Sequence, residues 1–406
     1  MGRRHKIMLV FGTRPEAIKM APVHRALQAR EGRFEVVCCV TAQHREMLDQ
    51  VLEVFGIVPD IDLDLMRPGQ NPTELCAAVL VAMRRVLRSQ TPDLVLVHGD
   101  TTTSMAAALA AFHEGVPVGH VEAGLRSHDM AAPFPEELNR RVTALIASYH
   151  FSPTSGSRAN LLAEGCAPES ITVTGNTVVD ALKSMVATMD ADAAMRIGIE
   201  SALDEALGFA WREQPLVLVT CHRRENVARG LSELCNALDR LALDFPDVHF
   251  VFPVHANPAI GEQVRARLAG RTNIHLSQPI DYVAFVQLLR KCHCVLTDSG
   301  GLQEEAIVLG KPVLIMREVT ERPEAVTAGG ARLVGTRRGP IVESVAELLR
   351  DPTAHALMAE APNPFGDGTA AERIAAFLEQ HLGSSVAPVP PDREISAALS
   401  PAFARR

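Results

Sequence analysis

The fold class is decided by the stretch Lys6-Ile7-Met8-Leu9-Val10-Phe11-Gly12-Thr13-Arg14-Pro15-Glu16. In this stretch a predicted apolar strand is followed directly by a predicted helix. Gly12 permits a tight turn, and Pro15 suits the first position of a helix. The apolar periodicity of residues 17–30 predicts that helix. The same alternation of apolar runs and helical patterns continues along the chain, which indicates α/β structure with parallel sheets covered on both faces.

Further apolar runs extend this pattern through both halves of the chain. They are residues 34–40, 94–98, 117–121, 216–220, 248–253, 294–297 and 312–315, with helical periodicity over residues 72–88 and 231–243 among others. A chain of 406 residues is too long for one ordinary core. The polar, Ala/Asp-rich segment 185–211 precedes a new strand, so we predict two Rossmann-like doubly wound parallel-sheet domains, residues 1–180 and 181–368. Residues 383–406, rich in Pro and Ala, are predicted to be a disordered tail.

Composition excludes several classes of function. The 40 Lys and Arg against 48 Asp and Glu give a net charge of −8, which argues against nucleic acid or an anionic membrane as a partner. The 8 cysteines form no CxxC pair and no zinc-type spacing, so we expect no metal and a reduced, cytoplasmic setting. No signal peptide or membrane-length apolar segment is recognisable. The GxGxxG and P-loop motifs are also absent, which removes the usual support for a nicotinamide cofactor or a nucleoside triphosphate.

Basic residues follow the first strand. Arg14 and Lys19 lie beside a predicted helix N-terminus at the carboxyl end of a parallel strand, where open α/β sheets bind ligands. This position favours phosphate binding over a solvated surface turn.

Three carboxylates follow later strand ends or begin a helix. Asp100 and Glu122 each come directly after an apolar strand, and Glu136 falls in the first turn of a predicted helix. An Asp at such a turn serves equally well as a helix cap, and a Glu in a first turn complements the helix dipole. The convergence of all three on one edge would instead supply an acid and a base, because clustered carboxylates have divergent pKa values.

The second half of the chain carries the pattern of a diphosphate site. His222 is followed by two arginines at a strand end. Ser299, Gly300 and Gly301 begin a helix with bare backbone N–H groups, which suit a diphosphate, and Glu305 is spaced to accept bonds from ribose hydroxyls. Arg322 adds a further cation beside the same site. This combination is typical of a nucleotide-sugar site.

With these residues the chain resembles the non-hydrolysing UDP-N-acetylglucosamine 2-epimerases. The family's motifs stand here in order: Phe-Gly-Thr-Arg-Pro-Glu-Ala-Ile-Lys (11–19), His-Gly-Asp-Thr-Thr-Thr (98–103), His-Val-Glu-Ala-Gly-Leu-Arg (120–126), Pro-Glu-Glu-x-Asn-Arg (135–140), Thr-Gly-Asn-Thr-Val (174–178), His-Arg-Arg-Glu-Asn (222–226), Asp-Ser-Gly-Gly-x-Gln-Glu-Glu (298–305) and Thr-Glu-Arg-Pro-Glu (320–324). The resemblance implies a fold of the glycosyltransferase-B type with a central cleft. It also implies a C-terminal helix near residues 369–382 that packs back on the first domain.

The implied reaction is reversible inversion at C2 of UDP-GlcNAc to give UDP-ManNAc, by elimination of UDP to 2-acetamidoglucal and re-addition, with no cofactor and no metal. Residues matching the family's catalytic positions are Asp100, Glu122, Glu136 and His222. Those matching its UDP-sugar contacts are Arg14, Lys19, His222, Phe285, Ser299, Gly300, Gly301, Glu305 and Arg322. Gln43 and His44 match the region where bacterial members bind UDP-GlcNAc as an activator, and the family is homodimeric.

Departures from the family pattern keep alternatives open. The loop 127–132 differs from the usual sequence, and Cys221 replaces a usual Gly. A hydrolysing relative that releases UDP and ManNAc, or an epimerase of a modified UDP-HexNAc, fits the same motifs. The three carboxylates argue against a glycosyltransferase, which abstracts no C2 proton, and against a non-catalytic sensor.

Overall fold

The computed structural model describes residues 3–41, 45–67, 69–221, 230–254, 258–268 and 270–382. The chain folds as two units. Unit 1 contains Met1–Thr174 together with Ala371–Arg406, and unit 2 contains Gly175–Ala370. The division after Thr174 compares with the predicted boundary at residue 180. The predicted tail, 383–406, lies outside the described residues.

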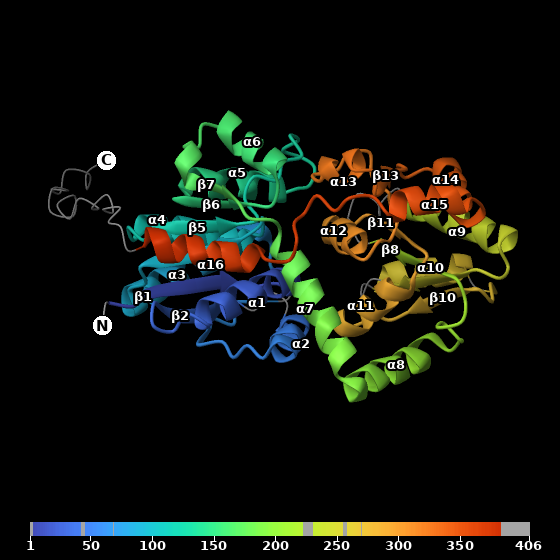
Figure 1. Cartoon of the computed structure of the whole chain (residues 1–406), viewed down its shortest axis with the longest axis horizontal. Coiled ribbons are helices and arrows are strands. Elements are labelled where there is room, and N and C mark those ends of the chain that lie inside the picture. The colour runs from blue at the N-terminus through green and yellow to red at the C-terminus, as the bar shows by residue number, and fades with distance from the viewer. Residues whose placement is uncertain are drawn as a thin grey trace, which may run out of the picture. The chain divides into compact units, whose positions relative to one another are not determined.

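Unit 1 is built on a parallel sheet of 7 strands in the order β3-β2-β1-β4-β5-β6-β7 (Figure 1). Its strands are β1 (His5–Phe11), β2 (Phe34–Val40), β3 (Ile61–Asp62), β4 (Leu94–His98), β5 (Val118–Val121), β6 (Tyr149–Ser152) and β7 (Ile171–Val173). Its helices are α1 (Arg14–Gln28), α2 (Arg45–Phe55), α3 (Pro72–Gln90), α4 (Thr102–His113), α5 (Glu136–Ile146), α6 (Ser155–Ala163) and α16 (Ala370–His381), with a 3₁₀ turn at Pro168–Ser170.

Unit 2 repeats the design with a parallel sheet of 6 strands in the order β10-β9-β8-β11-β12-β13. Its strands are β8 (Leu216–Thr220), β9 (His249–Pro253), β10 (Ile274–Ser277), β11 (Cys294–Thr297), β12 (Val313–Ile315) and β13 (Ala331–Leu333). Its helices are α7 (Thr177–Ala191), α8 (Ala193–Leu207), α9 (Leu231–Asp244), α10 (Pro258–Leu268), α11 (Tyr282–Lys291), α12 (Gly300–Val308), α13 (Pro323–Thr327), α14 (Arg338–Arg350) and α15 (Pro352–Ala359).

The predicted fold class, two Rossmann-like doubly wound parallel sheets, is therefore confirmed. The strands that meet at each centre, β1 with β4 and β8 with β11, are buried along almost their whole length. A central parallel strand has a helix layer on each face, so an uninterrupted apolar run is what such a strand requires.

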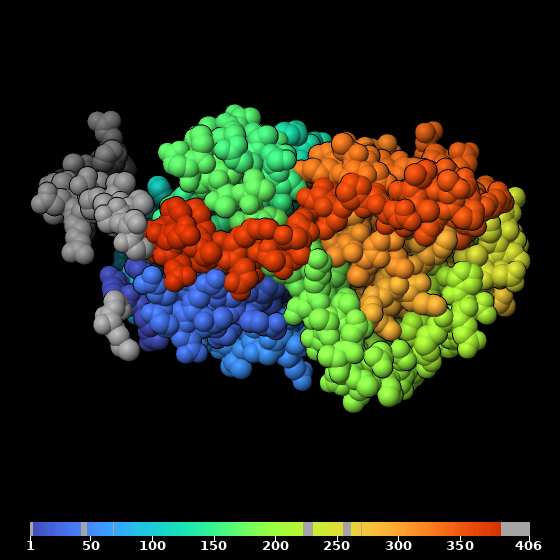
Figure 2. Space-filling view, in the orientation of Figure 1, coloured from blue at the N-terminus to red at the C-terminus, as the bar shows by residue number. Residues whose placement is uncertain are grey.

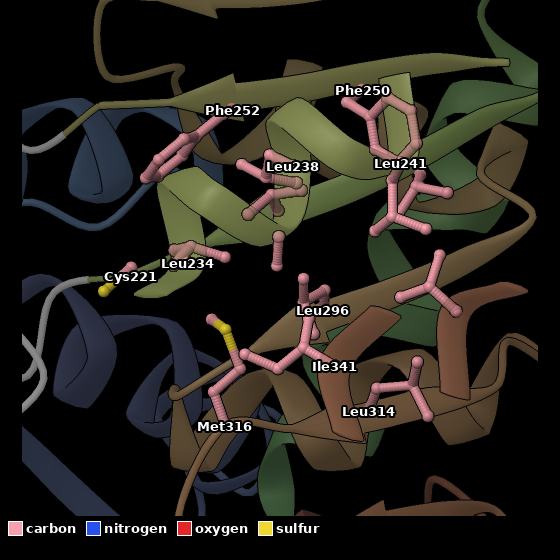
Figure 3. Close-up of a cluster of buried hydrophobic side chains, with 14 of the residues drawn as sticks. Cys221, Leu234, Leu238, Leu241, Phe250, Phe252, Leu296, Leu314, Met316 and Ile341 are labelled. Atoms are coloured by element: carbon pink, nitrogen blue, oxygen red, sulfur yellow. The ribbon is translucent and has the colours of Figure 1, made fainter. Parts of the chain in front are cut away.

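The core of unit 2 shows how an amphipathic helix closes one face of a sheet. Leu234, Leu238 and Leu241 recur at helical spacing along α9 and share one buried cluster with Phe250 and Phe252 of β9 (Figure 3). Side chains at this spacing share one face of the helix, so α9 is held by burial of that face.

Helix α16 returns from the end of the chain to unit 1. Figure 2 shows it in red across the surface of that unit. Arg373 donates from Nη1 to the carbonyl of Thr174 at 2.9 Å, and Arg30 of α1 forms ion pairs with Glu372 and Glu379. Contacts of both kinds attach the helix to unit 1.

Candidate functional site

Each sheet reverses its strand order once, and most of the predicted site residues that the structure describes follow strands at or next to these two positions. In unit 1 the reversal falls between β1 and β4, and in unit 2 it falls between β8 and β11. The crevice at the carboxyl ends of such strands is the usual ligand site of doubly wound sheets, because the connecting loops there diverge to opposite faces.

Glu16 ties the turn after β1 to the start of α4. Its Oε2 accepts hydrogen bonds from the backbone N–H groups of Gly12 (3.0 Å) and Thr13 (2.8 Å). Its Oε1 accepts from the hydroxyls of Thr101 (2.7 Å) and Ser104 (2.8 Å). The buried carboxylate thus satisfies the first donors of α1 and fixes the two turns of the strand-order reversal relative to one another. Arg14, the first residue of α1, is half-buried beside this frame.

Glu122 is the most constrained of the predicted carboxylates. Its side chain is only 5% exposed, it forms an ion pair with Lys19, and its Oε2 lies 3.6 Å from Nε2 of His98. Its backbone has φ of 64°, a left-handed conformation that costs a non-glycine residue about 1 to 2 kcal/mol. Strained backbone of this kind concentrates at functional sites.

Asp100 follows β4, the neighbour of β5, and is held by α5. Its Oδ2 accepts a hydrogen bond from Nη2 of Arg140 at 2.6 Å, and its carbonyl accepts from Nδ2 of Asn139 at 2.9 Å. Glu136 begins α5 four residues before Arg140, so the two share one face of the helix. The structure therefore places Asp100 and Glu122 after neighbouring strands of the unit 1 sheet, and Glu136 on the helix that holds Asp100.

His120 supports this edge from inside the sheet. It is fully buried, and its Nε2 donates to the carbonyl of Gly99 at 2.7 Å. Burial lowers the pKa of His120 to about 3, against the opposing effect of that hydrogen bond, so the ring is neutral near neutral pH. Gly99 has φ of +64°, and a Cβ there would lie 3.6 Å from Oε1 of Glu122. The β4 turn and the Glu122 carboxylate are thus in close proximity.

In unit 2 the corresponding edge presents the N-terminus of α12. The hydroxyls of Thr220 and Thr297 lie 2.6 Å apart across the strand-order reversal, and Oγ1 of Thr297 accepts from the N–H of Ser299 at 2.9 Å. Ser299 is the N-cap of α12 but makes no side-chain cap hydrogen bond. Gly300 and Gly301 follow, and among the described residues no atom outside its own helix backbone and chain neighbours comes within 4 Å of the Cβ position of Gly301. Bare N–H groups at a helix N-terminus suit a phosphate.

Arg322 occupies a buried ion network beneath these glycines. It pairs with Glu304 through Nε and with Oε1 of Glu321 through Nη1, at 2.8 Å in the second case. Glu321 also accepts from Arg317 at 2.6 Å. A Cβ on Gly300 would lie 2.5 Å from Nη1 of Arg322, so glycine is required at this position for the network to pack.

Glu305 and Phe285 lie on neighbouring helices, α12 and α11, and both are half-buried. Burial raises the pKa of Tyr282 well above its ordinary value, and the nearby Glu305 carboxylate raises it further. Tyr282, the first residue of α11, therefore lies within electrostatic range of the Glu305 carboxylate. Phe285, one turn along α11, packs against the unit 2 core.

Three predicted residues, His222, Gln43 and His44, lie outside the described residues. Across the ranges that the structure does describe, no group of three His, Cys, Asp or Glu side chains could hold a metal ion. None of the helices in those ranges is both long and apolar enough to cross a membrane. Cys221, the departure at the end of β8, is buried among Leu234, Met316 and Ile341 (Figure 3).

The sequence and the fold both match a known family of enzymes. The family model described as UDP-N-acetylglucosamine 2-epimerase matches residues 25–379. The UDP-N-acetylglucosamine 2-epimerase of Escherichia coli strain K12 is 51% identical over 379 residues, which cover 93% of this chain and 99% of that one. The chain belongs to the UDP-N-acetylglucosamine 2-epimerase family.

Solved structures of this family agree with the assignment. The UDP-GlcNAc 2-epimerase of Neisseria meningitidis, bound to UDP-GlcNAc, superposes with a TM-score of 0.88 at 44% identity, covering 92% of this chain and 100% of that one. The Staphylococcus aureus MnaA–UDP co-structure gives 0.86 at 42% identity, with coverage of 96% and 99%. Both relatives share the fold of this chain over nearly their full length.

Several residues that shape the site were not predicted from the family motifs. Glu16 could have been found from the Thr-x-x-Glu capping-box spacing of Thr13 and Glu16. Glu137 and Arg140 lie within the motif 135–140, but the sequence gives neither of them a role in the site. The pairing of Arg322 with Glu304 carried no local signal, because it depends on where the loop after β12 returns in space.

Proposed function

We propose that this chain interconverts UDP-GlcNAc and UDP-ManNAc by reversible inversion at C2, without hydrolysis and without a metal or nicotinamide cofactor. The observation that carries the proposal is the buried Glu122, which is paired with Lys19 and faces His98. It comes directly after β5, the strand that pairs with β4, and Asp100 follows β4. The C2 proton of a sugar is weakly acidic, so its removal requires a positioned base close to a group that can return a proton.

The proposed reaction has two balanced halves. A carboxylate takes the C2 proton, the C–H electron pair forms the C1–C2 double bond, and the C1–O bond breaks with its pair going to the β-phosphate of UDP. The products of this half are 2-acetamidoglucal and UDP. A β-phosphate oxygen then attacks C1 while a protonated side chain delivers a proton to the opposite face of C2. Asp100, Glu122 and Glu136 are the proposed acid and base groups, with His222 as the fourth.

UDP must remain bound between the two halves of the reaction, because it is the group that adds back to C1 of 2-acetamidoglucal. Unit 2 offers the means, because Ser299, Gly300 and Gly301 present N–H groups at the start of the nine-residue helix α12. We propose that Glu305 accepts from the ribose hydroxyls and that Phe285 lies near the uracil, with Arg14, Lys19 and Arg322 adding positive charge. The relatives solved with UDP-GlcNAc and with UDP support a UDP-sugar as the ligand.

The experiment is proton NMR of the protein with UDP-GlcNAc in deuterated water. UDP-ManNAc should appear, with deuterium at C2 of both sugars and total UDP-sugar conserved. Glu122→Gln should reduce deuterium incorporation by about 100-fold or more, the typical contribution of a general acid or base. Glu35→Gln is the matched control, since Glu35 lies on the same sheet, on β2, and pairs with Lys6 at the surface.

Other outcomes of that experiment would replace the proposal. Free UDP and ManNAc would assign the chain to the hydrolysing class. Intact UDP-GlcNAc with measurable binding would direct attention to modified UDP-HexNAc substrates and to the altered loop 127–132.

Two further parts of the proposal are that the chain is a homodimer and that UDP-GlcNAc also activates it at Gln43 and His44. Sedimentation velocity and the substrate dependence of the reverse reaction test them.

A further inference from the structure

Arg140 joins two carboxylates with one guanidinium group. Its side chain is 3% exposed, and its Nη2 donates to Oδ2 of Asp100 at 2.6 Å while its Nη1 donates to Oε2 of Glu137 at 2.9 Å. The planar fork has a fixed geometry, so pairing at one nitrogen constrains the direction of the other.

Glu137 is itself rigidly held. Its side chain is fully buried, and it accepts the N–H of Ser127 at 3.0 Å and Nε of Arg141 at 3.3 Å. Burial alone would raise the pKa of Glu137, but the Ser127 N–H and the Arg140 guanidinium lower it on balance. An ionised carboxylate at this position gives Arg140 a fixed partner on the same helix, α5, and also binds the first residue of the loop 127–132.

Asp100, by contrast, is 29% exposed and can reach water. A solvated Asp side chain at a strand end samples several rotamers, and each misplaced rotamer takes a reacting carboxylate away from its target. We propose that Arg140, anchored by Glu137, is a positioning residue that holds the Asp100 carboxylate in its reactive orientation. This inference rests on the proposed epimerase function.

A purely structural role for Arg140 would be the attachment of α5 to the sheet. The chain offers a matched control for that alternative. Arg141, the next residue, also contacts Glu137, and its side chain is 39% exposed. The second carboxylate near Arg141 is that of Glu164, whereas the second carboxylate bound by Arg140 is that of Asp100. A general weakening of the Glu137 cluster should therefore affect both arginine variants, and loss of Asp100 positioning should affect one.

The test is a double-mutant cycle of Arg140→Gln and Asp100→Asn, with C2 deuterium incorporation from UDP-GlcNAc as the activity and calorimetric UDP affinity as the binding control. Arg140→Gln should lower kcat by about 100-fold, as expected for a reacting group displaced by roughly 1 Å, and leave KM and UDP affinity within about threefold. In the Asp100→Asn background the same substitution should have almost no further effect, because the two act as one unit. Arg141→Gln should keep activity within about threefold of the wild type, since the side chain that it removes is solvent-exposed.

Three results would overturn the inference: losses that multiply in the cycle, an equal loss in Arg141→Gln, or a loss confined to KM. A wild-type protein that exchanges no C2 proton would overturn the proposed function and this inference with it.

Arg140→Lys provides a second test if Arg140→Gln does not fold, because it keeps the charge but not the two-pronged geometry. Its crystal structure should show the Asp100 carboxylate rotated while α5 is unmoved. An unchanged carboxylate would contradict the proposal.

Discussion

Lys19, inside α1, forms an ion pair with Glu122, which lies 103 residues further along the chain at the end of β5. Both side chains are nearly inaccessible to solvent. Transfer of two charges out of water is unfavourable, so a pair buried this deeply contributes little net stability but makes the loss of either partner costly. Stability and activity should therefore respond differently to its removal.

Lys19→Met leaves Glu122 buried without its cation, and we expect the free energy of unfolding to fall by about 3 to 5 kcal/mol. The double variant Lys19→Met with Glu122→Met should recover most of that loss but not the activity. Urea unfolding and C2 deuterium exchange measure the two effects. Lys6→Met is the control, because Lys6 pairs with Glu35 at the surface at 3.0 Å and such pairs contribute about 0 to 1 kcal/mol. Equal losses in Lys19→Met and Lys6→Met would disprove the expectation.

The two glycines at the start of α12 should differ in their tolerance of a methyl group. A Cβ on Gly300 would lie 2.5 Å from Nη1 of Arg322 and 2.6 Å from Oε1 of Glu321. The Cβ position of Gly301 has no atom within 4 Å from the described residues outside its own helix backbone and chain neighbours. Arg322 cannot swing aside easily, because it is also paired with Glu304. Gly300→Ala should cost about 1 to 3 kcal/mol by overpacking. Gly301→Ala should be neutral or stabilise by roughly 0.5 to 1 kcal/mol through helix propensity.

Thermal unfolding of both variants, followed by calorimetric titration with UDP, checks this pair. We expect Gly300→Ala to lower both Tm and UDP affinity, since the displaced guanidinium lies beneath the N–H groups assigned to the diphosphate. A Gly301→Ala protein that is as unstable as Gly300→Ala would show that the steric argument is wrong.

Much of the fold could be predicted from the sequence because central parallel strands are continuous apolar runs. Residues 34–40, 94–98, 216–220 and 294–297 match the observed strands residue for residue. Strands β7 and β13 have 3 residues each, of which only the first is buried, so they form no apolar run. The equally short β12 is buried throughout and was predicted. Helix α1 begins at Arg14 and not at residue 17, because the Thr13 capping box and Pro15 start it directly after the turn.

The candidate site was predictable only in part. Strand order brings Asp100 and Glu122 to the same sheet edge, so their proximity followed from the predicted fold. Their partners did not follow, because Arg140 is 40 residues from Asp100 in the chain and reaches it through the placement of α5. A pairing of this kind depends on tertiary structure and leaves no local pattern.

Buried histidines should make unit 1 sensitive to mild acid. Burial lowers the pKa of His120 to about 3 and that of His150, its neighbour across the strands, to about 4. The neighbouring His150 ring also lowers the pKa of His120, and the Arg126 guanidinium lowers the pKa of both rings. The unfolded chain binds these protons near pH 6.5 and the folded chain does not, so stability is full above pH 6.5 and decreases as pH falls toward 4.

Between pH 7.5 and pH 5.5 we therefore expect a loss of about 1 kcal/mol for each of these histidines. Urea unfolding across this range should give a flatter dependence for His120→Gln and His150→Gln than for the wild type. His113, exposed at the end of α4, is the control, and His113→Gln should retain the wild-type slope. Parallel slopes in all four proteins would assign the acid sensitivity to other groups.

Helix α16 should be required for the stability of unit 1. The ring of Phe377 makes edge contacts with Tyr149 and Phe151 of β6, at centroid distances of 5.5 and 5.4 Å. Phe377→Ala removes both contacts and leaves a cavity, so we expect a loss of about 3 kcal/mol, and Phe377→Leu should lose less because it keeps most of the apolar volume. Leu357→Ala, on α15 of unit 2 where the side chain is 72% exposed, should change stability by less than about 0.5 kcal/mol. Urea unfolding followed by far-UV circular dichroism measures the series. Equal stability of Phe377→Ala and the wild type would mean that α16 contributes nothing to unit 1, contrary to the contacts of Phe377 and Arg373.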